Sequence, residues 1–252
     1  MSLQIIDWPD FLRAGMNSAA SAMTIGVFDG IHLGHQALIR RIVSRGPNPT
    51  VVTFRENPKK VVAPMAFEGD VFSLKQKLNV LEQMGVSCLI LIDFSREFSK
   101  LSGWEFLELL EQQGKMAFLA IGSNFRCGYR QATDARFIAE MNKKKGIPTE
   151  VLPPVEAGTG PVSSSGIRSA IRSGNLRMAA ALMGRNHELD ISDIASEGHI
   201  YDVRSARRII PPDGSYPVRL RPGGIDCLAE IHDGKLDLSA GKAYRAESLE
   251  FV

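Results

Sequence analysis

The alternation of short apolar runs with helical patterns constrains the fold of this chain more than any other feature. Strand-like runs occur at MTIGVF, TVVTF, VSCLILI and MAFLAIG, a further one ends at TEVLPP, and segments with helical spacing separate them. Strands rich in Val, Ile and Leu that alternate with helices indicate a parallel sheet covered on both faces. The sequence therefore predicts an α/β fold built on a Rossmann-like parallel sheet.

The expected helices follow from the spacing of apolar residues and from stop signals. Leu74, Leu78 and Leu81 keep helical spacing, and Gly85 ends that segment. The same reasoning predicts helices over residues 34–45, 73–84, 103–113 and about 132–144, and two short helices between residues 165 and 184.

The sequence changes character beyond about Leu189. The short runs SYPVRL, DCLAEIH and KLDLS lie between the turn signals PPDG, RPGG and HDG, a pattern typical of a small antiparallel sheet or barrel. The chain is therefore expected to divide into residues 1–187, the main α/β domain, and residues 188–252, a small β-rich domain.

Composition narrows the possible partners. The net charge is only +2, and Lys and Arg form no tract, so duplex nucleic acid is not an expected partner. No leader pattern and no apolar run of about 20 residues is present, which predicts a cytoplasmic protein without a membrane partner. The three cysteines lie far apart, as expected of buried, reduced and inert thiols rather than zinc ligands. Nothing in the sequence predicts an oligomeric state.

The strongest chemical signal is GVFDGIHLGH, which follows an expected strand and opens an expected helix. Ligands of open α/β sheets bind beyond the carboxyl ends of the strands, and a helix start offers N–H groups to a phosphate. His32 and His35 are three residues apart, so both can stabilise charge on phosphate oxygens as a leaving group departs. In the alternative, Gly30 and Gly34 are ordinary turn residues and the histidines are solvated or bond backbone carbonyls. Two histidines within one such loop favour the phosphate site.

A second signal is PVSSSGIRSAIRSG. Its serines precede an amphipathic run, which predicts an N-capped helix with Arg168 in the first turn. Hydroxyls, a helix start and a guanidinium suit the β and γ phosphates of a nucleotide. The alternative is an ordinary serine cap followed by a surface arginine.

The order of these two segments, HxGH and later SSSGIR before a helix, is typical of the HxGH nucleotidyltransferase superfamily. More narrowly, the chain resembles the adenylyltransferase module of bacterial FAD synthetases, the bifunctional riboflavin kinase/FMN adenylyltransferases. The resemblance covers roughly residues 20–185 and rests on TIGVFDGIHLGH, VVTFRENP, SLKQKLNVLEQMGV, DFSREFSKLSGWEFL, IGSNFRCG and VSSSGIR.

The resemblance implies that ATP and FMN are the small-molecule substrates, that FAD and pyrophosphate are the products, and that Mg²⁺ accompanies the triphosphate. The FMN phosphate would attack the α-phosphorus in line, so positioning and charge stabilisation would provide most of the catalysis. The implied catalytic residues are His32, His35, Ser164 and Arg168; those that bind ATP are Gly26, Phe28, Asp29, Gly34 and Ser163; those on the acceptor side are Asn57, Asn124 and Phe125. No metal ligand is predicted.

Two departures from the family pattern leave the acceptor open. Where the family has TFDPHP, this chain has TFRENP, with Arg55 and Asn57 in place of the Asp and the His. Cys127 replaces the second aromatic residue of the family's GxDFxFG-like motif. An adenylyltransferase for another phosphate-bearing acceptor, such as a pantetheine phosphate or a mononucleotide, therefore remains an alternative.

The C-terminal segment departs further. Family members carry a riboflavin kinase barrel marked by a Gly-rich loop that ends in GFPTAN, and residues 189–252 contain no such string. We therefore expect a degenerate kinase-like remnant without kinase activity. A non-catalytic flavin- or nucleotide-binding module is the other alternative, and the intact HxGH and SSSGIR motifs argue against it. His32 and Arg168 are expected at a loop and a helix start rather than in a core.

Overall fold

The computed structural model describes residues 2–158, 160–238 and 246–252. The chain forms two compact units. The first unit comprises Met1–Ala66 with Leu78–Val155, and the second comprises Phe67–Lys77 with Glu156–Val252. The border expected between residues 187 and 188, where the sequence changes character, stays a prediction.

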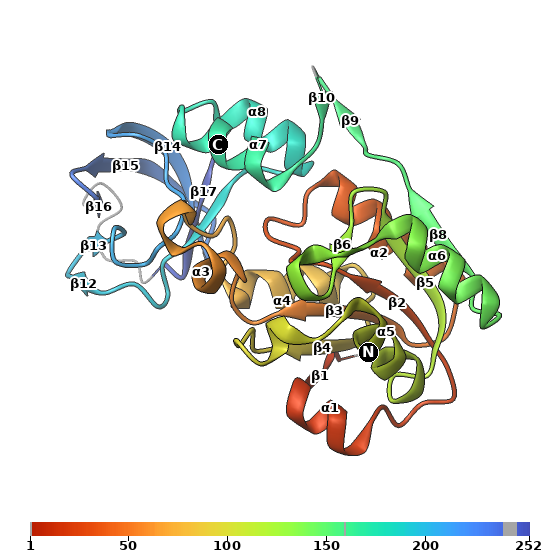
Figure 1. Cartoon of the computed structure of the whole chain (residues 1–252). Helices are drawn as coiled ribbons and strands as arrows, with labels where there is room; N and C mark the ends of the chain where they lie inside the picture. The colour runs from red at the N-terminus through yellow and green to blue at the C-terminus, as the bar shows by residue number, and fades with distance from the viewer. Residues whose placement is uncertain (1, 159, 239–245) are drawn as a thin grey trace. The chain divides into compact units, whose positions relative to one another are not determined.

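The first unit is built on a parallel six-stranded sheet in the order β1-β4-β3-β2-β5-β8, and Figure 1 shows these strands side by side. The predicted fold class is confirmed. The strands are β1 (Gln4–Asp7), β2 (Ser21–Ile25), β3 (Pro49–Phe54), β4 (Cys88–Ile92), β5 (Met116–Gly122) and β8 (Thr149–Leu152).

Both faces of this sheet are buried, as predicted for a parallel sheet between helices. Met23 and Ile25 of β2 lie in one apolar cluster with Phe106 of α5 (Gly103–Gln112). Ala22 and Thr24 alternate with them, so they face the opposite side, and they are buried as well. The central strands therefore leave only their ends exposed for binding.

The helices of the first unit mostly begin and end near their predicted bounds. They are α1 (Trp8–Ala14), α2 (Leu33–Arg45), α3 (Lys59–Val62), α5 and α6 (Ala135–Lys144), with short 3₁₀ turns at Pro64–Ala66, Phe98–Lys100 and Tyr129–Gln131; α4 (Leu74–Gln83) runs across the border of the two units. The helix expected from about residue 132 starts later, because Thr133–Asp134 pairs as β7 with β6 (Arg126–Cys127) and Asp134 caps the helix. Strand β1 and helices α1 and α3 were not predicted.

The second unit contains an antiparallel sheet in the order β11-β17-β14-β15-β16-β13-β12, as the C-terminal turn signals predict. Its core contains Leu189, Val218, Ala229, Leu236 and Leu249. The strands are β11 (Glu188–Asp190), β12 (Ser196–Glu197), β13 (Ile200–Asp202), β14 (Gly214–Arg221), β15 (Ile225–His232), β16 (Lys235–Asp237) and β17 (Ser248–Phe251). The last residue of the expected KLDLS strand lies outside the described residues.

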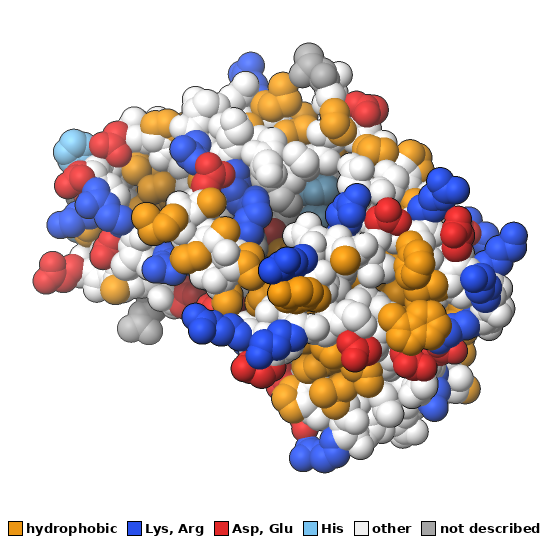
Figure 2. Space-filling model, viewed as in Figure 1, with side chains coloured by type: hydrophobic (Ala, Val, Ile, Leu, Met, Phe, Trp, Pro, Cys, Tyr) orange, Lys and Arg blue, Asp and Glu red, His pale blue; other side chains and the backbone are white. Residues whose placement is uncertain are grey.

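Two predicted short helices and a small hairpin complete the second unit. They are α7 (Ser164–Arg172), α8 (Leu176–Met183), β9 (Glu156–Ala157) and β10 (Gly160–Pro161). Acidic and basic side chains are interspersed on the face shown in Figure 2, in line with the small net charge of +2. None of the helices in the described ranges has the length and apolar character needed to cross a membrane.

Candidate functional site

The loop between β2 and α2 runs through backbone conformations that few side chains adopt. Phe28 and Ile31 have φ angles of 52° and 35°, and Gly30 between them has a φ of 75°. Positive φ at a bulky residue costs on the order of 1–3 kcal/mol. The side chains of Phe28 and Ile31 are fully buried, and their burial offsets this cost. Buried side chains therefore hold the loop in one strained shape.

His32 and His35 lie together where α2 begins. His32 is the N-cap, and its Nδ1 accepts a hydrogen bond of 3.3 Å from the backbone N–H of His35. Because Nδ1 accepts, the proton of the neutral His32 ring lies on Nε2. The two rings stack with centroids 3.6 Å apart, and Phe28 meets His35 edge-on at 5.0 Å. The structure therefore brings the two predicted imidazoles together.

Neighbouring residues fit tightly around the histidine pair. A Cβ at Gly34 would lie 3.2 Å from Cε1 of His32, and one at Gly26 would lie 3.1 Å from Cε2 of Phe28. Both glycines therefore leave room for a ring that shapes the loop. Asp29, within the same loop, is 4% exposed. His32 is itself only 7% exposed, so the expectation that it lies outside the packed interior was wrong.

The strand order places this loop at the switch point of the sheet. Strand β2 has β3 on one side and β5 on the other, and all three run parallel. The chain passes from β2 to β3 in one direction and later returns to the other side of β2 with β5. The carboxyl ends of β2 and β5 therefore flank the crevice where open α/β sheets bind ligands.

The three residues expected on the acceptor side follow the neighbouring strands. Asn57 comes after β3, is 8% exposed, and its Oδ1 accepts a hydrogen bond of 3.1 Å from the backbone N–H of Lys59. Asn124 is exposed and Phe125 is half-buried, just after β5. Parallel strands end at one edge of their sheet, so the first unit brings all three residues to the edge that carries the histidine loop.

Arg55 has a structural role that the sequence did not reveal. Its Nε donates to Oδ1 of Asp93 at 2.9 Å, and its Nη2 donates to Oδ1 of Asp7 at 2.5 Å. Asp7 ends β1 and Asp93 follows β4, so Arg55 joins the ends of three adjacent strands. These partners lie 48 and 38 residues away in the sequence, where no local pattern indicates them.

The predicted N-capped helix is present in the second unit as α7. Oγ of Ser163 accepts a hydrogen bond of 3.1 Å from the backbone N–H of Gly166, and Ser164 is the first helical residue. Arg168 is the fifth residue of α7, so its predicted place in the first turn was wrong. It is 5% exposed, and its Nε donates to the carbonyl oxygen of Gly69 at 2.8 Å. Arg168 is therefore a buried residue. This corrects both the expected place outside a core and the alternative of a surface arginine.

The predicted site residues form two groups. Gly26, Phe28, Asp29, His32, Gly34, His35, Asn57, Asn124 and Phe125 belong to the first unit, while Ser163, Ser164 and Arg168 belong to the second. The first group lies at the edge of the parallel sheet where β2, β3 and β5 end, and the second group lies in α7 and at its N-cap. A single ATP site that uses both groups is therefore part of the proposal below.

The three cysteines are free thiols. Burial raises the pKa of Cys88 to about 11 and that of Cys127 to about 12. Burial and the charge of Asp226 raise the pKa of Cys227. The thiols are therefore protonated and weakly nucleophilic at neutral pH. Across the described ranges, no group of three or more His, Cys, Asp or Glu side chains is arranged to hold a metal ion.

A parallel sheet whose switch point carries a capped helix start and paired imidazoles is an arrangement suited to phosphate groups, as expected of an α/β nucleotidyltransferase. The chain belongs to the FAD synthetase family, whose model matches residues 15–166, more than half of the sequence. The expected activity, FMN adenylyltransferase, and the expected family are therefore confirmed, with ATP and FMN as substrates.

Individual relatives agree with this family. The bifunctional riboflavin kinase/FMN adenylyltransferase of Escherichia coli K12 is 27% identical over 212 residues, which cover 79% of this chain and 67% of that protein. A Listeria monocytogenes FAD synthetase is 25% identical over 209 residues, which cover 81% of this chain and 83% of that protein. A structure titled macrolide-efflux protein from Streptococcus pneumoniae matches with a TM-score of 0.79 at 24% identity, covering 99% of this chain and 89% of that chain, and it supports the fold alone.

Proposed function

We propose that the histidine loop and the start of α7 bind one ATP and pass its adenylyl group to the phosphate of FMN. One observation carries this proposal: His32 and His35 stack 3.6 Å apart at a capped helix start, beside the switch point of the sheet. The reaction forms the bond between the FMN phosphate oxygen and the α-phosphorus of ATP. It breaks the bond between that phosphorus and the bridging oxygen, so pyrophosphate leaves.

The histidines act on charge rather than through a covalent intermediate. The N–H groups at the start of α2 and the positive end of its dipole attract the triphosphate. Nε2 of His32, fixed as a donor by the bond at Nδ1, can donate to an oxygen that gains charge as pyrophosphate departs. The strained, buried loop holds the rings in place before ATP arrives, so little reorganisation is needed.

The second group would bind the β and γ phosphates. Ser163 and Ser164 lie at the start of α7, where backbone N–H groups and hydroxyls suit an anion. Arg168 donates Nε to a carbonyl oxygen, and the terminal nitrogens of its guanidinium supply further donors of fixed geometry. This charge would stabilise the leaving pyrophosphate.

Asn57, Asn124 and Phe125 would form the acceptor side. They follow β3 and β5, the strands on either side of the strand that leads into the histidine loop. Because Asn57 already caps a turn through Oδ1, its amide N–H groups remain the donors suited to an acceptor phosphate. The altered TFRENP turn keeps other phosphate-bearing acceptors as an alternative, which parallel assays with pantetheine phosphate and mononucleotides would test.

The proposed reaction also involves a metal ion, a cellular compartment and a limit on the activity of the C-terminal segment. Mg²⁺ would arrive with ATP as part of the substrate complex, so a chelator should abolish turnover and excess Mg²⁺ should restore it. The cytoplasm, which supplies ATP and FMN, would be the site of action. Residues 189–252 lack the GFPTAN string, which supports an absence of riboflavin kinase activity in this chain. Formation of FMN from riboflavin and ATP would refute that absence.

The test is to incubate the purified chain with FMN, ATP and Mg²⁺ and to separate the flavins by chromatography. We expect FAD and pyrophosphate in equal amounts, with the adenylyl label of ATP in FAD. Tight binding of ATP and FMN without pyrophosphate release would instead indicate a non-catalytic binding module.

A further inference from the structure

We propose that the C-terminal sheet positions Arg168 for adenylyl transfer, acting through Asp190, Arg208 and a strap formed by Phe67–Lys77. This inference rests on the proposed function, in which Arg168 binds phosphate. Asp190 and Arg208 are thus positioning residues that act through another side chain. The C-terminal segment would then contribute to adenylyl transfer without any chemistry of its own.

The strap contacts the guanidinium of Arg168 directly. The carbonyl oxygen of Gly69 accepts the Nε–H of Arg168 at 2.8 Å across 99 residues of sequence. A carbonyl that holds Nε fixes the plane of the guanidinium and therefore the directions of its terminal N–H groups. At the edge of the strap, Arg172 of α7 pairs with Glu68. The direction of the Arg168 fork thus depends on where the Gly69 carbonyl lies.

The backbone of the strap is in turn locked to residues 207–209. The N–H of Asp70 donates to the carbonyl of Arg207 at 3.0 Å, and the N–H of Ile209 donates to the carbonyl of Asp70 at 3.0 Å. Gly69 has a φ of +117°, and a Cβ there would lie 2.9 Å from the backbone of Arg208. Only glycine fits between the guanidinium and this backbone.

Arg208 ties that backbone to the sheet. Its Nη1 donates to the carbonyl of Asp190 at 2.5 Å, and its two terminal nitrogens pair with both carboxylate oxygens of Asp193 at 2.6 Å. The Arg208 side chain is only 7% exposed. Asp190 ends β11, so the bond from Nη1 to its carbonyl sets residues 207–209 against a strand of the sheet, and the bidentate pair with Asp193 fixes the guanidinium beside it.

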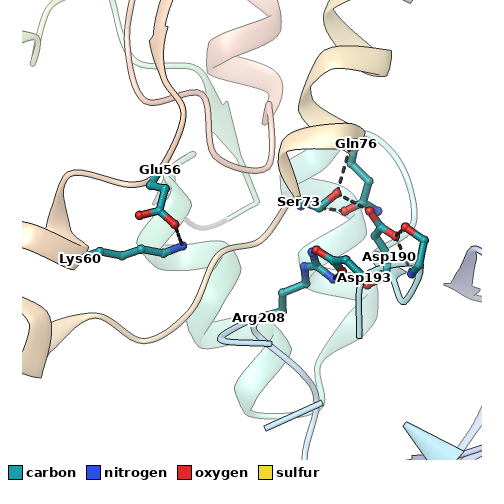
Figure 3. A network of polar contacts seen from close by, with 8 residues as sticks. Glu56, Lys60, Ser73, Gln76, Asp190, Asp193 and Arg208 are labelled. Carbon is teal, nitrogen blue, oxygen red and sulfur yellow. Dashed lines mark hydrogen bonds and ion pairs between the residues drawn. The ribbon is translucent and has the colours of Figure 1, made fainter. Parts of the chain in front are cut away.

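The carboxylate of Asp190 in turn bonds Ser73, which belongs to the strap (Figure 3). Oγ of Ser73 donates to Oδ2 of Asp190 at 2.5 Å, and both the N–H and the hydroxyl of Ser192 donate to Oδ1. Ser73 also exchanges bonds with Gln76 at the start of α4, and the amide of Gln76 donates to the carbonyl of Glu188. Both parts of the strap are therefore linked to Asp190 of β11: Asp70 through the backbone of residues 207–209, and Ser73 directly.

The charge of Asp190 is suited to this role. Burial acts to raise the pKa of Asp190, but hydrogen bonds from Ser192 and Ser73 more than offset it, and the pKa lies below its usual value. The carboxylate is therefore charged at neutral pH and bonds Ser73 strongly. Removing it leaves a buried hydroxyl without its acceptor and releases the strap from one side. A displacement of about 1 Å at a phosphate-binding group is enough to lower a rate severalfold or more.

The experiment compares Asp190→Ala and Arg208→Gln with Arg221→Gln. Arg221 is a matched control because it pairs with Glu250 in the same sheet, at β14 and β17. Asp190→Asn keeps the shape of the side chain, so it replaces Asp190→Ala should the alanine variant not fold. Values of kcat and of KM for ATP and FMN are measured, and hydrogen exchange follows the amide of Asp70.

We expect kcat/KM for ATP to fall about tenfold in Asp190→Ala and Arg208→Gln, with KM for FMN unchanged. Exchange at Asp70 should accelerate in both variants, whereas Arg221→Gln should change neither quantity. The decisive comparison repeats Asp190→Ala in an Arg168→Ala background. If Asp190 acts through Arg168, the further loss there should be less than about twofold.

Two results would overturn the inference while the proposed function stands. One is wild-type kcat/KM for ATP in both strap variants; the other is the same tenfold loss in the Arg168→Ala background, which would mark a general structural effect. The proposed function fails separately, and this role with it, if the wild-type chain makes no FAD or if Arg168→Ala is fully active.

Discussion

The starts of α2 and α7 use the same device with different support. Each helix is capped by a side chain, His32 in the first unit and Ser163 in the second, that accepts a backbone N–H three residues on. In α2 the functional ring is itself the cap, and its contacts with His35 and Gly34 lie within three residues of sequence. In α7 the functional guanidinium is held by Gly69, 99 residues away. One helix start is thus made locally, and the other depends on tertiary contacts.

This difference teaches how chemistry and stability are coupled in each region. A side chain whose support is local can lose its chemistry while the fold survives, provided that the replacement still caps the helix. A buried side chain held by a distant carbonyl links two segments that are far apart in the sequence, so its loss affects rate and stability together. The predictions below test that contrast.

Arg168→Ala should have the largest combined effect. FAD formation should fall about 100-fold, because a charged donor to the leaving pyrophosphate is lost. The free energy of unfolding should also fall by about 2 kcal/mol, because the buried Gly69 carbonyl loses its donor. Steady-state assays and urea unfolding check the two quantities. An unchanged free energy of unfolding would contradict the claim that the start of α7 depends on tertiary contacts.

His32→Asn should lower FAD formation by a similar factor, about 100-fold, while leaving the free energy of unfolding nearly unchanged. Asn caps helices well but has no imidazole. The matched variant His32→Ala should lose the same activity and a further 1 kcal/mol or so of stability, because the cap is gone. Equal stability of the two variants would show that the cap at α2 contributes nothing.

His187 should make the second unit sensitive to acid. Burial lowers the pKa of His187 to about 4, so the native ring stays neutral while the unfolded chain takes up a proton below about pH 6.5. The native state therefore loses about 2 kcal/mol of unfolding free energy between pH 7 and pH 5. Urea unfolding of the wild type and of His187→Phe, which keeps a flat ring against Phe251, measures the difference. The same pH dependence in both proteins would contradict this assignment.

Gly34→Ala should have the smallest effect. The added Cβ would press on the His32 ring from 3.2 Å, and that ring has to move by a few tenths of an ångström. We expect KM for ATP to rise by a factor of about 3, with the fold intact, since alanine favours a helix. Gly166→Ala is the matched control in α7, where the added Cβ would lie 3.4 Å from the nearest atom, Oγ of Ser163. An equal change in both variants would argue against a special fit at His32.

The sequence predicted the locally encoded parts of the molecule. The strand-to-helix loop of Gly26 to His35, the serine cap of α7 and the parallel sheet all follow from periodicity, glycines and capping residues that are neighbours in the chain. Strand β1 was missed: it is a short edge strand with exposed and half-buried side chains, and its partner β4 lies far away in the sequence.

The remaining features depend on distant partners. No local pattern indicates that Arg55 bonds Asp7 and Asp93. In the sequence, Arg55 was interpreted only as the replacement of the Asp in the family's TFDPHP turn. Arg168 was expected at a helix start rather than in a core, because nothing near it in the sequence points to the carbonyl of Gly69. Burial and partners of this kind emerge from the packing of segments far apart in the chain.

The central proposal is that the starts of α2 and α7 both serve adenylyl transfer from ATP to FMN. The most direct measurement follows the α-phosphate of labelled ATP into FAD, with FMN and Mg²⁺ present, in the wild type, His32→Asn and Arg168→Ala. We predict labelled FAD and equimolar pyrophosphate from the wild type, and a loss of about 100-fold in each folded variant. Labelled FAD at the wild-type rate from either variant would contradict the claim.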